Sequence, residues 1–267
     1  MTHVFDEAIA LVPIAPAPEY VVRATTHPAY NNMVGPFGGV TAATVVNGIQ
    51  RHPEVLGDPL ALTINYAAPI AEGEWDLALE PVRTNRTNQH WTFAIRQADQ
   101  TVATGTAVFG TVRDTWGDTE STPPSVPPVD DVEPSDFPDF IAWAKSYDKR
   151  FVVGGIDAKS DDSTSTYWLR DEPARPLDFP ALTAMTDSFF PRAFLRHGTY
   201  MPAGTITLTT YFHATAEELA AHGARHVLAT AKAARFGHGH FDQYGQIWSD
   251  DVLLATTHQL VYFKNPA

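Results

Sequence analysis

Asp187 is the residue whose type and surroundings point most directly to chemistry. It stands in the stretch LDFPALTAMTDSFFPRAFL, among apolar and hydroxyl-bearing neighbours. Asp178 and Pro180 favour the start of a helix and Pro191 cannot continue one, so a helix is predicted over roughly 179–190. Apolar residues at three- and four-residue steps give that helix a buried stripe. A carboxylate on such a helix needs a polar partner or a chemical role.

An internal repeat singles out three polar positions. VTAATVVN aligns with LTAMTDSF, LTINYA with TLTTYF, and VATGTAVFG with LLATTHQLVYF. A tandem duplication is the simplest explanation. In this alignment the second copy has Asp187, Thr205 and Gln259 where the first has Val45, Leu60 (approximately) and Ala107. If the three polar residues converge, the second half holds the chemistry and the first half serves as packing and wall.

Each of the three polar residues also has a structural explanation. Asp187 could be an ordinary helix-surface acid, Thr205 a β-forming residue, and Gln259 a satisfied core amide. Gln259 shares its predicted strand face with apolar residues, where an unpaired amide costs on the order of 1–3 kcal/mol. A nearby carboxylate would satisfy that amide.

The sequence pattern predicts that a helix and an antiparallel sheet in each half position these residues. Period-two alternation predicts strands at about 20–25, 60–67, 74–83, 89–97 and 101–112, then at about 163–170, 204–213, 225–236, 239–249 and 251–264. Short connections favour hairpins. A further helix is expected over about 38–51, where Gly38 and Gly39 allow close backbone approach.

A stretch rich in proline and acid separates the two halves. Residues 114–139 show almost no apolar periodicity, which is typical of an exposed connection. We therefore predict a first domain over 1–113, a linker over 114–139, and a second domain over 140–267 that carries the candidate residues. The predicted fold class is α+β.

Composition excludes several classes of protein. The 267 residues carry a net charge of -13, which disfavours a nucleic-acid partner or an anionic membrane. The chain has no cysteine, which excludes disulfides and thiol catalysis. Asp6 and Glu7 stand where a signal peptide needs positive charge, and no apolar run is long enough to span a bilayer. We expect a cytoplasmic protein with no membrane partner.

The motifs together resemble the acyl-CoA thioesterase II family, the tandem double-hotdog thioesterases. The resemblance covers nearly the whole chain and includes GPFGG, LTINYAAPI, AMTDSFF, TITLTTYFH and LLATTHQLVYF. It implies two tandem hotdog domains joined edge to edge and hydrolysis of acyl-CoA without metal or organic cofactor. It also implies that Asp187 accepts the proton of a water held by Thr205 and Gln259, with no covalent acyl-enzyme.

Further expectations concern the substrate contacts and the association of chains. Backbone N–H groups of Gly38 and Gly39 would polarise the substrate carbonyl. Homo-oligomers are possible. Coenzyme A phosphates could meet a set of basic residues, although ordinary surface charge explains these residues better: Arg225, Lys232 and Arg235.

Three alternatives remain open at the level of sequence. A hotdog hydratase typically pairs the acid with a histidine five residues later, but here that residue is Arg192. A non-catalytic acyl-CoA-binding module would keep the fold without turnover. His238 and His240, with Asp242 close by, could present metal ligands, although a glycine-rich hairpin explains them as well.

Overall fold

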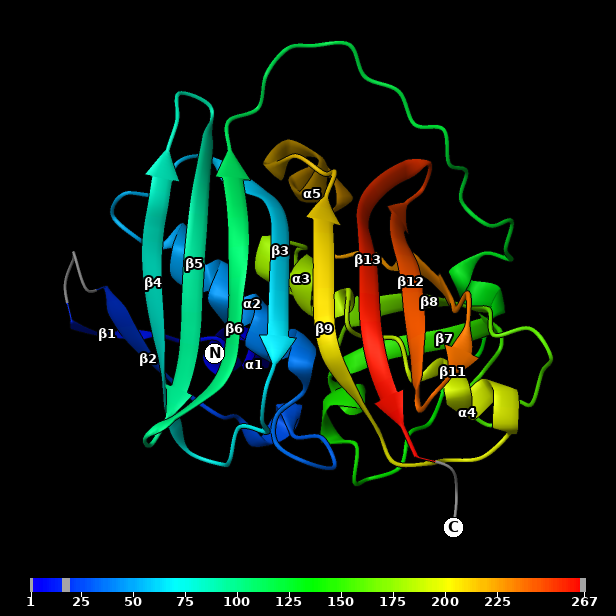
Figure 1. Cartoon of the computed structure of the whole chain (residues 1–267). Coiled ribbons are helices and arrows are strands. Elements are labelled where there is room, and N and C mark those ends of the chain that lie inside the picture. Colours follow the sequence, from blue (N-terminus) through cyan, green and yellow to red (C-terminus); the bar gives the residue numbers. More distant parts are fainter. Residues whose placement is uncertain (1, 16–19, 265–267) are drawn as a thin grey trace.

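The computed structural model describes residues 2–15 and 20–264, which form two similar halves side by side (Figure 1). The elements of the first half are α1 (Val4–Ala8), β1 (Val12–Ala15), β2 (Val21–Thr25), the 3-10 turn η1 (Pro28–Tyr30), α2 (Gly38–Gln50), β3 (Asp58–Tyr66), β4 (Glu74–Thr84), β5 (Asn88–Gln97) and β6 (Gln100–Gly110). The helix and the alternating strands predicted for this half are confirmed to within a few residues.

The second half repeats the plan with additions. Its elements are η2 (Val129–Asp131), η3 (Ala142–Ser146), β7 (Tyr147–Val153), β8 (Ser165–Asp171), α3 (Phe179–Met185), α4 (Arg192–His197), β9 (Ala203–Phe212), α5 (Ala216–His222), β10 (Val227–Lys232), β11 (Phe236–Gly237), β12 (His240–Ser249) and β13 (Val252–Phe263). The periodicity had indicated neither β7 nor the short helix α4 that follows the candidate acid.

All strands of the described residues belong to one antiparallel sheet. The order is β1-β2-β4-β5-β6-β3-β9-β13-β12-β10-β8-β7, with β11 paired to β12. The halves join where β3 pairs with β9, and the Oγ1 atoms of Thr63 and Thr209 lie 3.0 Å apart there. Helices α2 and α3 lie together behind the central strands (Figure 1). This edge-to-edge arrangement is the architecture expected of a double hotdog.

The strand register relates the two halves residue by residue. Thr63 faces Thr209 at the junction, so a pseudo-twofold axis passes between them. Ala107 pairs with Leu62 in the first half, and Gln259 pairs with Leu208 in the second. These pairs are equivalent under the axis, so the predicted correspondence between Ala107 and Gln259 is confirmed.

The approximate correspondence between Leu60 and Thr205 is wrong by one residue. The register of β3 shifts at Leu60, and the register of β9 shifts at Ile206. Because the two bulges are equivalent, the counterpart of Thr205 is Pro59. A bulge inserts one residue into one strand only, and an alignment by eye does not reveal it.

The connection between the halves runs over the surface and then packs against the second half. It crosses the end of the sheet as a long segment without regular structure (Figure 1). Pro127 O accepts a hydrogen bond from Trp168 Nε1 at 3.0 Å, and the ring of Phe137 lies 6.4 Å from that of Phe151. The second part of the predicted linker therefore contributes to the core of the second half.

The two halves also contact each other through aromatic rings. Phe37, just before α2, stacks on Trp143 of η3 with ring centroids 4.1 Å apart and an interplanar angle of 5°. The backbone N–H of Trp143 donates to Asn31 O at 3.1 Å. Among the described residues, no helix has the length and apolar character needed to cross a membrane.

Candidate active site

Asp187 lies in the turn that follows α3, not on the helix itself. Asp178 caps α3 as predicted, accepting a backbone N–H of the first turn at 2.9 Å. The helix ends at Met185 rather than near residue 190. The hydroxyls of Thr186 and Ser188 each donate to a backbone carbonyl three residues earlier, at 2.7 Å. Such local bonds compete with the helical ladder, and they leave Asp187 in a tight turn.

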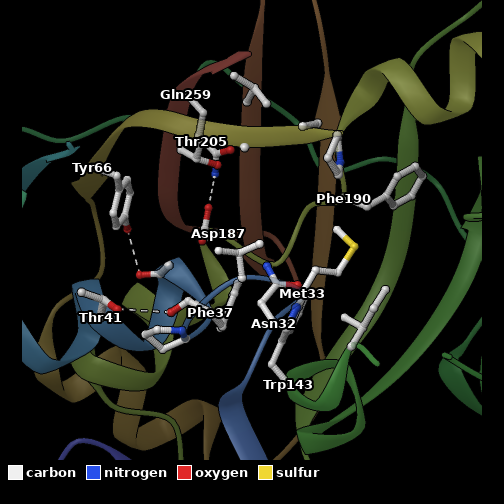
Figure 2. Close-up of a pocket in the computed structure, with 18 of the residues that line it drawn as sticks. Asn32, Met33, Phe37, Thr41, Tyr66, Trp143, Asp187, Phe190, Thr205 and Gln259 are labelled. Carbon is white, nitrogen blue, oxygen red and sulfur yellow. Dashed lines mark hydrogen bonds between the residues drawn. The ribbon is translucent and has the colours of Figure 1, made fainter. Parts of the chain in front are cut away.

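Asp187 and Gln259 form a buried pair. The exposed fraction is 8% for Asp187 and 3% for Gln259, and Gln259 Nε2 donates to Asp187 Oδ1 at 2.8 Å (Figure 2). Burial raises the pKa of Asp187 to about 7, although the Gln259 amide and the Gly39 backbone N–H offset part of that rise. The carboxylate predicted to satisfy the Gln259 amide is therefore Asp187.

Thr205 lies beside this pair at the start of β9. It pairs with Val261 and lies on the cavity wall together with Asp187 and Gln259 (Figure 2). Its side chain is half-buried, and within residues 2–15 and 20–264 its hydroxyl makes no hydrogen bond. The three predicted residues thus line the same cavity, and the Thr205 hydroxyl is available to a bound molecule.

The two glycines at the start of α2 lie against the carboxylate. A Cβ atom on Gly38 would stand 2.7 Å from Asp187 Oδ2 and 3.1 Å from the Tyr66 hydroxyl. A Cβ on Gly39 would stand 2.5 Å from the backbone oxygen of Ala184, where α2 approaches α3. The close backbone approach expected of these glycines is present, and it brings Gly38 to Oδ2, the Asp187 oxygen that Gln259 does not contact.

Gly38→Ala is expected to lower activity roughly tenfold and to lower the thermal stability slightly. The added methyl group would displace Asp187 Oδ2 and press on the Tyr66 hydroxyl, and at the first residue of α2 alanine does not gain its helix-interior advantage over glycine. Thiol release and thermal unfolding of the variant measure the two effects. Gly48→Ala is the matched control, because it changes the same helix, and its added methyl group would contact the methyl groups of Leu77, Leu79 and Leu11 away from Asp187. Equal activity in both variants would contradict the expectation.

A cavity of about 390 Å³ opens in front of these residues. Both halves supply its walls, which include Asn32, Met33, Phe37, Tyr66, Val102, Phe137, Trp143, Lys149, Phe189, Phe190 and Tyr200. Most of these side chains are apolar or aromatic, and the polar side chains of Gln259, Thr205 and Tyr66 lie near Asp187 (Figure 2). The cavity suits an apolar chain whose reactive group sits at the carboxylate.

Two cavity residues were not indicated by the sequence pattern. Tyr66, at the end of β3, donates a hydrogen bond from its hydroxyl to Gly38 O at 2.8 Å (Figure 2). Both residues belong to the first half of the chain, whereas Asp187 belongs to the second. Lys149 of β7 is only 2% exposed, and its Nζ donates to Ser188 O at 2.7 Å. Burial, aided by the positive charge of Arg192, lowers the pKa of Lys149 to about 7. No ion pair involves Lys149 in the described part of the chain.

Arg192 and Gln243 were also missed as site residues. Both are almost completely buried, and Gln243 lines the cavity. Gln243 pairs across the strands with Gln259, just as Trp91 pairs with Ala107 in the first half. Aligning β5 with β12 would have shown a glutamine in place of a tryptophan at that position.

The remaining candidates lie away from the cavity. Asp242 Oδ1 accepts the backbone N–H groups of Ala234 and Arg235 at 3.0 and 2.9 Å, so it closes a turn. Within the described ranges, no three His, Cys, Asp or Glu side chains gather closely enough to hold a metal ion. Arg225 and Lys232 form surface ion pairs with Asp250 and Asp162, each at 2.9 Å.

The two packed helices, the joined sheet and the shared cavity define a double-hotdog protein. Models of the acyl-CoA thioesterase family match the chain in two places. The N-terminal domain of the family matches residues 27–110, and its C-terminal domain matches residues 123–263. The chain therefore belongs to the acyl-CoA thioesterase family, as its motifs had indicated.

Solved structures share this fold over the full chain. A conserved hotdog-fold protein of unknown function from Alicyclobacillus acidocaldarius is 44% identical, with a TM-score of 0.95 and 100% of each chain covered. A putative thioesterase II from Thermobifida fusca is 16% identical, with a TM-score of 0.81 over 98% of this chain and 97% of that one. The acyl-CoA thioesterase II TesB2 from Mycobacterium marinum is 17% identical, with a TM-score of 0.75 over 98% and 99%. No match was found among curated proteins.

Proposed function

We propose that this chain hydrolyses acyl-CoA thioesters to a free acid and coenzyme A, with Asp187 as the general base. The observation that carries the proposal is the buried Asp187 at the cavity wall, with Oδ1 held by Gln259. Its pKa of about 7 suits a group that must both accept and return a proton near neutral pH. Membership of the thioesterase family supports the reaction class.

The proposed reaction is a direct attack by water. Asp187 Oδ2, on the side of Gly38 and Tyr66, accepts a proton as the water oxygen bonds to the thioester carbonyl carbon. The tetrahedral intermediate collapses, the carbon–sulfur bond breaks, and the proton returns from Asp187 to the sulfur. The products are a carboxylic acid and the thiol of coenzyme A.

The other predicted residues take supporting roles in this scheme. Thr205 holds the attacking water through its hydroxyl, which has no other partner among the described residues. Gln259 acts mainly on Asp187, because its Nε2 atom already contacts Asp187 Oδ1 and, at 3.4 Å, Thr186 O. The Gly38 N–H, at the start of a 13-residue helix, is the proposed donor to the carbonyl oxygen.

Thiol release from short, medium and long acyl-CoA substrates tests the proposal. Wild-type protein should release free thiol and show which acyl length it prefers. A thermal shift caused by acyl-CoA without any thiol release would instead identify a binding module. Light scattering on the same sample tests the predicted association of chains.

The rate of hydrolysis is expected to rise with pH and level off above about pH 7. Asp187 acts as a base only when deprotonated, and burial raises its pKa to about 7. The pKa of Lys149 is also about 7, so the titration of Lys149 must be distinguished from that of Asp187. The kcat/KM profile should keep its midpoint in Lys149→Met. If the transition near pH 7 disappears in Lys149→Met, then Lys149, and not Asp187, is the general base.

A further inference from the structure

A chain of buried side chains leads from Arg192 to Asp187. Arg192 Nε donates to Gln243 Oε1 at 3.1 Å, and Gln243 Nε2 donates to Gln259 Oε1 at 3.0 Å. Gln259 Nε2 then donates to Asp187 Oδ1 at 2.8 Å. The exposed fractions along the chain are 0%, 1%, 3% and 8%. A cation and a carboxylate are thus connected through two amides that are shielded from water.

The cation determines which way both amides point. An arginine side chain only donates hydrogen bonds, and a carboxylate only accepts them. Gln243 must therefore turn its oxygen to Arg192 and its nitrogen to Gln259. Gln259 in turn must present its nitrogen to Asp187. Reversing either amide would place two acceptors or two donors against each other inside the protein, where an unmatched polar group is costly.

Arg192 has no carboxylate of its own within the described residues. Its guanidinium donates to Phe190 O at 3.0 and 2.6 Å and to Ser163 O at 3.3 Å, and it lies 4.1 Å from the centre of the Phe190 ring. Burial lowers its pKa to about 10, which leaves it charged at neutral pH. The anion that it reaches, through the two amides, is Asp187.

The first half of the chain shows that the fold does not need this network. At the equivalent cross-strand pair it has Trp91 and Ala107, which are 1% and 2% exposed. The same helix-on-sheet layer is therefore stable with an apolar pair. A buried polar network in place of such a pair is weak evidence for stability and requires another reason.

We infer that Arg192 and Gln243 are positioning residues for the proposed hydrolysis, because they hold Gln259 with its amide nitrogen toward Asp187. This inference rests on the proposed function. The orientation fixes Asp187 Oδ1 and leaves Oδ2 facing Gly38 and the cavity. It also favours the charged form of Asp187, because the amide dipoles are aligned with their positive ends toward the carboxylate.

Gln243→Glu is the sharpest test of this inference. Glutamate has nearly the same shape and would pair well with Arg192, but a carboxylate cannot donate to Gln259 Oε1. Gln259 should then turn over and present its oxygen to Asp187. We expect kcat to fall at least about tenfold with little change in KM, and the midpoint of the pH profile to rise by about one unit.

A matched control and a direct titration make the test decisive. Gln246→Glu adds the same charge to β12 on the opposite face and should leave kcat and midpoint unchanged. Carbon-13 NMR of aspartate-labelled protein, with Asp187→Asn to assign the signal, measures the Asp187 pKa without any substrate. The other titratable groups near Asp187 are Tyr66, Tyr147, Tyr167 and Lys149; the tyrosine pKa values are raised, so only Lys149 titrates in the same range.

The possible outcomes separate this inference from the proposed function. Wild-type hydrolysis together with an unchanged rate and Asp187 pKa in Gln243→Glu would overturn the positioning role and leave the hydrolase standing. Absence of thiol release from the wild type would overturn the hydrolase, and the NMR titration would still decide the orientation of Gln259. If Gln243→Glu does not fold, Gln243→Met removes the same donor without adding charge. It should lower kcat by a smaller factor, because Asp187 alone then orients Gln259, and an unchanged kcat would overturn the positioning role.

Discussion

Asp187→Asn should reduce the rate of thioester hydrolysis by roughly 10²–10⁴-fold, the usual contribution of a general base. The expected loss is chemical and not structural. Asparagine has the shape of aspartate, and its oxygen can still accept the hydrogen bond from Gln259 Nε2. The amide that replaces the carboxylate cannot take up the proton of the attacking water. Quenched time-point assays of thiol release, run at several enzyme concentrations, will measure the low rate that remains in the variant.

The same variant also separates an enzyme from a binding module. Asp187→Asn should bind acyl-CoA as well as the wild type does, as a thermal shift can show. It should also be at least as stable at about pH 8, because it removes a charge from a buried position. Hydrolysis at the wild-type rate in this variant would eliminate Asp187 as the base. Loss of folding would shift its role to structure.

Asp171→Asn should stabilise the protein at about pH 8, by at most about 4 kcal/mol. Asp171, at the end of β8, is 1% exposed, and neither of its oxygens has a hydrogen-bond partner within the described residues. The nearest cation, Arg175, lies at 3.9 Å and forms closer pairs with Asp178 and Asp6. Burial therefore raises the pKa of Asp171 to about 7.

The sign of the effect follows from the two pKa values. In the unfolded chain an aspartate titrates near pH 4, at about 3.9. Between that value and about 7 the folded protein binds a proton that the unfolded chain does not, so stability falls as pH rises through this window. Asparagine does not titrate, and its amide can both donate to and accept from nearby groups such as the Tyr30 and Tyr147 hydroxyls. Burial raises the pKa of both hydroxyls, and the Asp171 charge raises it further.

Urea unfolding at about pH 5 and about pH 8 measures this difference. The advantage of Asp171→Asn over the wild type should grow with pH. Asp118→Asn, which changes an exposed acid in the long connection, is the control and should show no such trend. An advantage that does not change with pH would mean that Asp171 is already charged in the folded protein. Because Asp171 lies outside the cavity lining, hydrolysis should keep its pH profile in this variant.

The sequence predicted the elements whose burial alternates cleanly. Trp91, Phe93 and Ile95 of β5 are all buried, as their period-two spacing indicated. Strand β7 was missed because its inward position is occupied by Lys149, a residue that normally marks a solvent-facing side. The end of α3 was missed because hydroxyl side chains, not a proline or glycine, terminate that helix.

Only part of the candidate site could be predicted from the sequence. The contact between Asp187 and Gln259 followed from the need of a buried amide for a partner. Gln243 carried no such signal, since a lone glutamine in a strand usually faces water. Tyr66 could not be assigned because its position at the cavity depends on how the two halves join. Contacts that depend on tertiary packing are not encoded in local spacing.

The duplication has a consequence for stoichiometry. Two identical subunits related by a twofold axis carry every side chain twice, so each change in one pocket occurs in the other. In this chain the position equivalent to the Gln243 and Gln259 pair is filled by Trp91 and Ala107. A fused chain can thus keep polar residues at one of the two equivalent positions and fill the other with packed apolar side chains. Titration with a non-hydrolysable substrate analogue should accordingly count one binding event per polypeptide.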